Sequence, residues 1–383
     1  MIQDMVIIDP RQRIDINNPD VISRHALYAK ALSGSDEFHT RRLVVIQPSS
    51  SKKSSMIQPA SNLLVIRVSN FYTKLLWDRK FAQKISLRYS LNPALLISGD
   101  PDISYIAAKM FEKLNSESHL KQLPFYVQVH SELNWKLGTS DLVQFLKFCV
   151  ARFALKNATR IRSTSNEHRS QISKSFNIPS QKIDAIPLPL PENSFRNINF
   201  KFPRPETIAF VGRLHKERNP ESFLIIAAGY CAKNPLARIL IIGDGPEKAR
   251  LEGISRKLPC ANQINFLGEL DSKALGKAWK EIGVLISTAS YESYGRSMRE
   301  ALLNGVPVLA MNSLGSRSLA EEAPLKWVEL IENISDPETL HRQIKQLLEL
   351  RLDESYRISQ MRRQQNIPNQ LVESWLRSLS AGA

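Results

Sequence analysis

The second half of the chain contains the run Glu292-Ser293-Tyr294-Gly295-Arg296-Ser297-Met298-Arg299-Glu300-Ala301-Leu302-Leu303-Asn304-Gly305-Val306-Pro307-Val308-Leu309. It follows residues 284–288, a short apolar run bounded by polar residues that is typical of a buried strand. The pattern predicts a strand, a short loop carrying Glu292, a helix from about Gly295, a stop at Gly305 and a further strand. In a parallel α/β sheet this order places the helix start at the carboxyl ends of the strands, where ligands bind.

The polar groups around this helix start predict an anion site. The exposed amides of residues 295–297, together with the helix dipole, would favour a phosphate. Glu300, about one turn further, could accept hydrogen bonds from a vicinal diol such as that of ribose, and Glu292 could reach one more polar group. Together these features describe a nucleotide sugar. The alternative is that Ser293 caps an ordinary helix and both carboxylates are solvated.

Two arginines predict a second part of the same site. Arg213 and Arg218 bracket a short loop after the predicted strand 207–211, and their guanidinium groups could clamp a pyrophosphate. The alternative is that both arginines form surface salt bridges with Glu217 or Glu221, which contribute little stability.

Strands and helices alternate along both halves of the chain, which predicts an α/β fold with parallel sheets of the Rossmann type. The prolines between 187 and 205 indicate a domain boundary. We therefore expect an N-terminal domain over 1–200, joined by a C-terminal helix over 364–383, and a second domain over 201–363. The predicted strands are 5–8, 42–46, 63–68, 94–98, 125–129, 161–165, 207–211, 238–242, 264–270 and 284–288. We also expect a Ser-rich loop at 49–55, helices near 74–87, 103–114 and 135–158, a loop at 312–318, and final helices at 354–363 and 368–379.

Composition restricts the class of protein. The 383 residues are 43% hydrophobic and 23% charged, as is ordinary for a globular protein with two cores. No apolar run approaches the roughly 18 residues of a membrane span, and the N-terminus lacks the pattern of a secretory signal. Three widely spaced cysteines argue against a disulfide framework or a zinc site. We expect a cytoplasmic protein.

The net charge of +15 predicts an anionic partner, and it is concentrated in the first half. Residues 1–200 carry 27 Lys and Arg against 16 Asp and Glu. The anionic partner that binds this basic half could be a membrane surface, a charged acceptor or a nucleic acid. Because the sequence has no nucleic-acid-binding motif, nucleic acid is the least favoured partner. Aromatic and basic residues are interleaved over 135–158, as in an interfacial membrane helix, although a core helix with a basic edge explains the pattern more simply.

Several of these motifs together resemble a known family. Phe210–Leu214, Ile241–Pro246, Phe266–Gly268 and the two carboxylates Glu292 and Glu300 running into Gly305–Val308 are similar, in order and spacing, to glycosyltransferase family 4. The likeness spans about residues 207–320, and the first half resembles the family more loosely. It implies the GT-B fold, in which two Rossmann-like domains face each other across a cleft.

The resemblance also implies an activity. Such an enzyme moves a sugar from a UDP- or GDP-sugar to a glycan or glycolipid acceptor, with retention of anomeric configuration and without a cofactor or a catalytic metal. Surface polysaccharide or glycolipid synthesis, with peripheral binding to the inner face of a membrane, would fit. An epimerase or phosphorylase of the same fold, or a non-catalytic basic binding protein, is the alternative.

The family resemblance assigns roles to residues of this chain. Arg213 and Arg218 would neutralise the diphosphate, Glu300 would hold the ribose and Glu292 would contact the donor sugar, while His130 would line the sugar site from the other domain. Further donor contacts would come from Gly212, Leu267, Gly295, Arg296, Ser297 and Met298. The chain departs from the family at Arg218, where lysine is usual, at Asn219, where glycine is usual, and in lacking a Gly-Gly loop after its first strand.

Overall fold

The computed structural model describes residues 3–12, 14–15, 17–34, 41–115, 123–130, 142–195, 205–351 and 353–381. It consists of two compact units, Met1–Pro189 with Asn366–Ala383 (unit 1) and Leu190–Gln365 (unit 2). The predicted boundary at 200/201 falls within 196–204, outside the described residues. Among the helices of the described ranges, none has the length and apolar character needed to cross a membrane.

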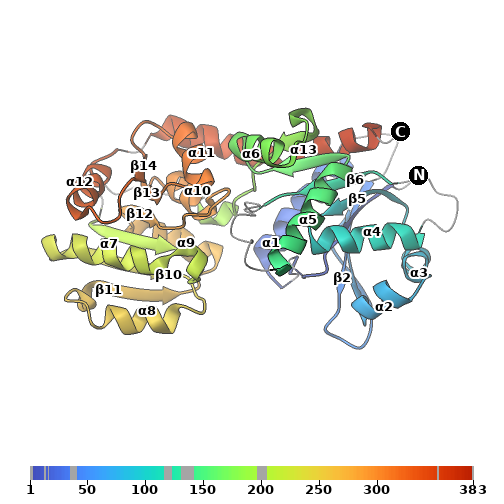
Figure 1. Ribbon diagram of the computed structural model, residues 1–383, viewed down its shortest axis with the longest axis horizontal. Helices are drawn as coiled ribbons and strands as arrows, with labels where there is room; N and C mark the ends of the chain where they lie inside the picture. Colours follow the sequence, from blue (N-terminus) through green and yellow to red (C-terminus); the bar gives the residue numbers. More distant parts are fainter. Residues whose placement is uncertain are drawn as a thin grey trace. The chain divides into compact units, whose positions relative to one another are not determined.

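Unit 1 is built on an eight-stranded sheet with the order β3-β4-β2-β1-β5-β6-β7-β8. Its strands β2, β5 and β6 are labelled in Figure 1, together with helices of the same unit. All neighbouring strands are parallel except β3 and β4, which are antiparallel. The inner strands are near-continuous apolar runs because helices cover both faces of the sheet. The strands are β1 (Gln3–Ile8), β2 (Arg41–Pro48), β3 (Ser55–Ala60), β4 (Leu63–Val68), β5 (Pro93–Ser98), β6 (Phe125–Gln128), β7 (Arg160–Ser163) and β8 (Ile183–Ala185).

The helices of unit 1 form a layer on each face of this sheet. Helices α2 to α6 cover one face, while α1 and the second half of α13 cover the other. The helices are α1 (Pro19–Ser33), α2 (Phe71–Trp77), α3 (Phe81–Arg88), α4 (Ile103–Asn115), α5 (Leu142–Asn157), α6 (Asn166–Phe176), the 3-10 turn η2 (Ser180–Lys182) and α13 (Glu354–Ala381). Unit 1 is therefore a doubly wound α/β domain, as predicted.

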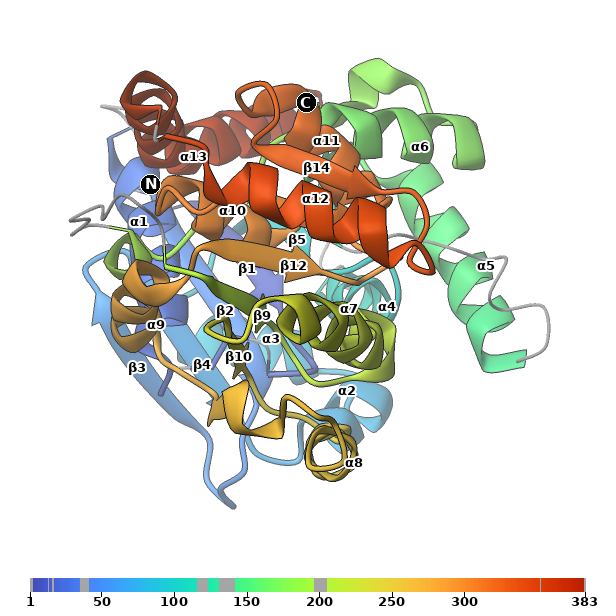
Figure 2. The ribbon, with the colours of Figure 1, turned by 90° about the vertical axis from the view of Figure 1, so that its left-hand side faces the viewer.

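Unit 2 has a six-stranded parallel sheet with the order β11-β10-β9-β12-β13-β14. One helical layer (α7, α8 and α12) packs on one face, and α9, α10 and α11 pack on the other. Figure 2 shows α7 and α12 lying side by side over β9 and β12. The strands are β9 (Thr207–Val211), β10 (Arg238–Ile242), β11 (Ile264–Gly268), β12 (Val284–Ser287), β13 (Val308–Met311) and β14 (Val328–Ile331).

The helices of unit 2 follow its strands in alternation. They are α7 (Pro220–Lys233), α8 (Lys248–Ser255), α9 (Ser272–Ala278), α10 (Arg296–Leu303), α11 (Leu314–Glu322) and α12 (Pro337–Leu348). Short 3-10 turns are η3 (Glu192–Ser194), η4 (Lys216–Arg218), η5 (Ala261–Gln263) and η6 (Trp279–Glu281). The α/β prediction is confirmed in this unit as well.

Four local expectations were wrong. The segment predicted as a helix near 74–87 is two helices, α2 and α3, broken at residues 78–80. Part of the expected Ser-rich loop joins β3, an exposed edge strand. The expected loop at 312–318 begins α11, because Ser313 and Ser316 form a reciprocal capping box. The final two predicted helices are one helix, α13, with Pro368 inside it; tertiary packing of its apolar face compensates for the missing amide.

The predicted helix at 135–158 is described only as α5, and its part at 135–141 lies outside the described residues.

Glycines control how closely the loops after β9 and β10 approach each other. Gly243 has φ of +135°, and a Cβ at this position would lie 2.0 Å from the Gly212 carbonyl oxygen. Gly245 has φ of +153°, and its Cβ would lie 2.4 Å from the Leu214 carbonyl oxygen. The close approach is held by backbone bonds from Gly212 to Ile242 (3.0 Å) and from Leu214 to Asp244 (2.8 Å). Only glycine satisfies both the conformation and the contact.

We therefore expect Gly243→Ala to lower the free energy of unfolding of unit 2 by about 3 kcal/mol or more, because backbone atoms must move apart. Gly229→Ala is the matched control: Gly229 lies in α7 with open space around it, and the substitution should stabilise the helix by about 0.5–1 kcal/mol. Urea unfolding of the two variants measures the difference. Equal stabilities would contradict the proposed steric role.

Candidate functional site

The candidate site lies at the carboxyl edge of the sheet of unit 2, between β9 and β12. From β9 the chain winds outward through β10 and β11, and on the other side of β9 it continues through β12, β13 and β14. The loops that leave β9 and β12 therefore diverge at this point, which is where open α/β sheets bind ligands. Thr288, just beyond β12, ties the two loops together: its hydroxyl lies 3.1 Å from the Arg218 carbonyl oxygen and 2.7 Å from that of Asn219.

The loop after β9 presents two cations. Arg218 ends the 3-10 turn η4 and is half-buried, whereas Arg213 is exposed. Burial lowers the pKa of the Arg218 guanidinium, and the charge of Arg213 lowers it further, so the two groups are close enough to repel each other. Across the described residues, no ion pair or hydrogen bond of the Arg213 side chain is found. Such a loop suits a ligand with more than one negative charge.

Glu292 neutralises Arg218. The Arg218 guanidinium donates to Glu292 Oε2, and the amide of Tyr294 donates to Glu292 Oε1 at 3.3 Å. Of the predicted alternative partners, Glu221 pairs with Arg250 at 2.8 Å. Glu217 is exposed and only raises the pKa of Arg218 through its charge. Glu292 is thus not a solvated surface carboxylate, and it lies beside the cationic loop.

Asn219 explains how the cationic loop turns into α7. It has φ of +47°, a left-handed conformation that asparagine adopts more readily than other residues with a side chain. Glycine is usual at this position in the family that the sequence resembles, and both residue types tolerate this backbone. The asparagine therefore preserves the turn although it departs from the family pattern.

Helix α10 begins after a glycine. Its N-cap residue is Gly295, with φ of +70° and no side-chain cap hydrogen bond, and not Ser293, which the alternative proposed. The amides at the start of this helix are oriented for an anion. A side chain at 295 would also collide with Met298, because an added Cβ would lie 2.2 Å from the Met298 Cε atom. Met298 itself is 1% exposed and packs in the core, so its side chain is not available to a ligand.

Glu300 is buried one turn into α10. It is 4% exposed, and the Arg296 guanidinium donates to its Oε1 at 3.1 Å. Arg296 is half exposed, so this pair lies at the boundary between the core and solvent. A buried carboxyl group with a cationic partner can accept hydrogen bonds from a ligand that reaches it.

The remaining predicted site residues are distributed over several elements of both units. Gly212 follows β9 directly, and Ser297 is half-buried in the first turn of α10. Leu267 is 44% exposed in β11, two strands away from β9. His130 belongs to unit 1, two residues after β6, and its predicted role toward the sugar stays a prediction. Thr288 was missed in the sequence; its position as the polar residue that closes a buried strand was the available signal.

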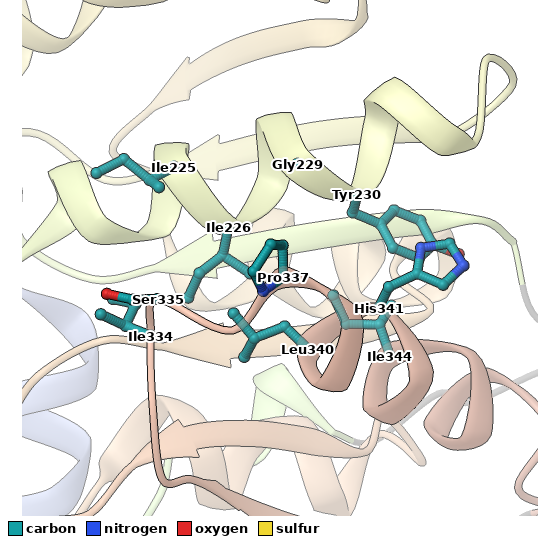
Figure 3. Close-up of a pocket in the computed structure, with 10 residues that line it drawn as sticks. All are labelled: Ile225, Ile226, Gly229, Tyr230, Ile334, Ser335, Pro337, Leu340, His341 and Ile344. Carbon is teal, nitrogen blue, oxygen red and sulfur yellow. The ribbon is translucent and has the colours of Figure 1, made fainter.

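A pocket elsewhere in unit 2 has different chemistry. It measures about 210 Å³ and lies between α7 and α12 (Figure 3). Its walls are mostly apolar, and its polar members include Tyr230 and His341, whose rings are 5.2 Å apart. The ten residues that line it include none of the predicted donor-site residues. We do not assign this pocket to the nucleotide sugar.

Residues 191–365, nearly the whole of unit 2, match the family model described as glycosyl transferases group 1. We call this stretch the group 1 domain, after the model that it matches. It carries Arg213, Arg218, Glu292 and Glu300. Membership of family 4 in particular stays a prediction.

Relatives extend this result. Over 112 residues the chain is 33% identical to a GDP-mannose-dependent alpha-mannosyltransferase of Mycolicibacterium smegmatis; the match covers 29% of this chain and 27% of that protein. The sucrose-phosphate synthase of Thermosynechococcus elongatus superposes with a TM-score of 0.66 at 16% identity, over 97% of this chain and 94% of that one. HepE of Anabaena, solved with UDP-glucose, gives 0.65 at 13% identity, over 99% and 97%. The predicted GT-B fold class is thereby confirmed.

The two arginines of the group 1 domain should respond differently to mutation. Arg218→Gln leaves the Glu292 carboxylate without its cation, and we expect the free energy of unfolding to fall by about 1–3 kcal/mol. Arg213→Gln removes an exposed cation, so the change should stay within about 0.5 kcal/mol. Thermal and urea unfolding of both variants at neutral pH measure this. A larger loss at Arg213 than at Arg218 would contradict the pairing.

Proposed function

We propose that the chain is a retaining glycosyltransferase that moves a sugar from a UDP- or GDP-sugar to a glycan or glycolipid acceptor. The observation that carries the proposal is the meeting of Arg213, Arg218, Glu292 and the start of α10 at one edge of a group 1 domain. The mannosyltransferase relative is named for GDP-mannose, and HepE was solved with UDP-glucose. These names support the donor class without selecting its base.

The proposed chemistry assigns each group a task. As the bond from the anomeric carbon to the diphosphate breaks, the diphosphate takes the electron pair. The acceptor hydroxyl oxygen forms a new bond to the same carbon, and its proton passes to the departing diphosphate. The cations Arg213 and Arg218 and the amides of α10 would stabilise the charge that develops on the departing diphosphate. Because Arg218 already pairs with Glu292, the donor would enter a site whose charges are preformed. We assign no side chain as a nucleophile.

The role of Glu300 is tested through the ribose of the ligand. Glu300→Ala should weaken binding of the preferred nucleoside diphosphate by about 10–150-fold, the loss expected for hydrogen bonds to a charged group worth about 1.5–3 kcal/mol. It should also abolish any preference for the ribose form over its 2′-deoxy form. Calorimetric titration with uridine and guanosine diphosphates and their 2′-deoxy analogues measures both effects.

Glu321→Ala is the control for this experiment, because Glu321 is an exposed carboxylate near the end of α11. Its affinities should equal those of the wild type. Transfer or donor hydrolysis across a nucleotide-sugar panel gives the activity. Unchanged affinity and unchanged ribose preference in Glu300→Ala would overturn the assignment of Glu300, and no binding by the wild type would overturn the proposed function.

A membrane surface is the partner we propose for the basic half of the chain. Helices α2 and α3 lie together in unit 1 (Figure 1), and they expose large apolar side chains, with Trp77 81% and Leu87 82% exposed. Residues 71–88 also hold five basic residues against one acidic residue, Asp78, which pairs with Lys84 at 2.8 Å. Exposed aromatic and basic groups together favour an anionic lipid surface.

Vesicle co-sedimentation tests this partner. Wild-type protein should sediment with vesicles that contain anionic phosphatidylglycerol and less with neutral phosphatidylcholine, and raised salt should weaken the binding. Trp77→Ala should reduce the bound fraction several-fold, while Leu325→Ala, which changes an equally exposed apolar side chain in unit 2, should not. Equal recovery in the supernatant with both lipids would reject the proposal and leave a protein partner as the explanation of this surface.

A further inference from the structure

A buried arginine lies behind the loop that carries Glu292. Arg299 is 7% exposed and projects back from α10 toward the start of its own helix. Its Nε donates to the Tyr294 carbonyl oxygen at 3.0 Å, and its guanidinium carbon lies 4.4 Å from the centre of the Tyr294 ring. Arg299 therefore holds the peptide group that directly precedes the N-cap residue Gly295.

A carboxylate from the next helix compensates the charge of Arg299. Glu322, at the end of α11, accepts from both terminal nitrogens of Arg299 at 2.9 and 3.1 Å. Ser318 donates to the same carboxylate at 3.1 Å. Burial alone would raise the pKa of Glu322, but the nearby arginines hold it below its usual value, so the carboxylate stays charged. This geometry is a bidentate pair, which fixes the orientation of the guanidinium.

Helix α13 contacts Glu322 of α11 and Tyr294 of the loop. Arg363, on α13, donates to Glu322 Oε2, so the carboxylate bridges two arginines. The Tyr294 side chain, which is 2% exposed, hydrogen-bonds with the side chain of Gln364, the next residue of α13. Arg363 and Gln364 are near the end of the part of α13 that belongs to unit 2, before the helix continues in unit 1.

These contacts bear on the ligand groups of the loop. Gly295 has a left-handed conformation and makes no side-chain cap hydrogen bond, so the position of the first amides of α10 depends on the main chain that leads into the helix. The main chain at 292–294 is held instead from behind, by Arg299 at Tyr294 and by the Gly315 amide, which donates to the Glu292 carbonyl oxygen at 2.6 Å. A displacement of about 1 Å at such a site is enough to weaken binding or catalysis by up to about 100-fold.

We infer that Arg299 is a positioning residue of the donor site, which acts through the Tyr294 carbonyl group, with Glu322, Arg363 and Gln364 anchoring it to α13. The inference rests on the proposed function, because the ligand it serves is the donor diphosphate. Arg299 touches neither donor nor acceptor in this account. Its role is to fix the positions of Glu292 and of the first amides of α10.

Arg299→Lys tests the inference. Lysine keeps the charge but cannot reach the Tyr294 carbonyl and both Glu322 oxygens together. We expect the dissociation constant of the nucleoside diphosphate that the wild type binds, and the donor KM, to rise about tenfold, with a smaller change in kcat per folded molecule. Glu322→Gln, which keeps the shape but not the charge, should give an intermediate effect and serves if the lysine variant does not fold.

A stability-matched control separates positioning from general destabilisation. Leu340→Ala removes a core side chain of α12 in unit 2, so it should lower the melting temperature but leave KM and affinity unchanged. A merely structural role for Arg299 would reduce the folded fraction, and hence apparent kcat, with the same KM. If the wild type binds a nucleoside diphosphate and both Arg299→Lys and Glu322→Gln bind it equally well, the inference is overturned. If the wild type binds none, the proposed function fails and the inference fails with it.

Discussion

A parallel sheet with helices packed on both faces leaves only its edges for a ligand, and this constraint organises unit 2. The apolar residues of the six strands are divided between two helical layers, so neither face is open. At the carboxyl edge the loops from β9 and β12 separate because the chain winds in opposite directions from that point. Gly243 and Gly245 let the neighbouring loop approach the chain after β9, and Thr288 joins the loops across the opening.

At this edge Arg218 and Arg299 are paired with carboxylates, whereas Arg213 is exposed. The half-buried Arg218 pairs with Glu292 and the buried Arg299 pairs with Glu322, so both cations have carboxylate partners before any ligand arrives. Buried charges without partners are costly, which is why these pairs are formed within the protein. Arg213 is exposed and, among the described residues, engaged in no ion pair. The ion pairs therefore hold the loops of the site from the protein side, and Arg213 presents positive charge on the solvent side.

Most of the fold followed from local patterns. Apolar runs predicted the buried strands, and helix signals predicted most helices, because each pattern reflects burial within its own element. The failures have physical reasons. The strand β3 is exposed at a sheet edge, so its sequence carries little apolar signal. The sequence predicted two helices at 354–363 and 368–379, but packing of the apolar face around Leu371 and Trp375 keeps α13 continuous through Pro368.

For the site, the sequence by itself determined features that depend on neighbours in the chain: the loop that carries Glu292, the helix start near Gly295, and Glu300 one turn into that helix. Tertiary structure alone decided which charges meet. Arg218 and Glu292 are 74 residues apart, and Arg363 reaches Glu322 across 41. Such pairs leave no periodic trace in the chain, because side chains of distant segments are brought together only by strand order and by the helices packed on the sheet.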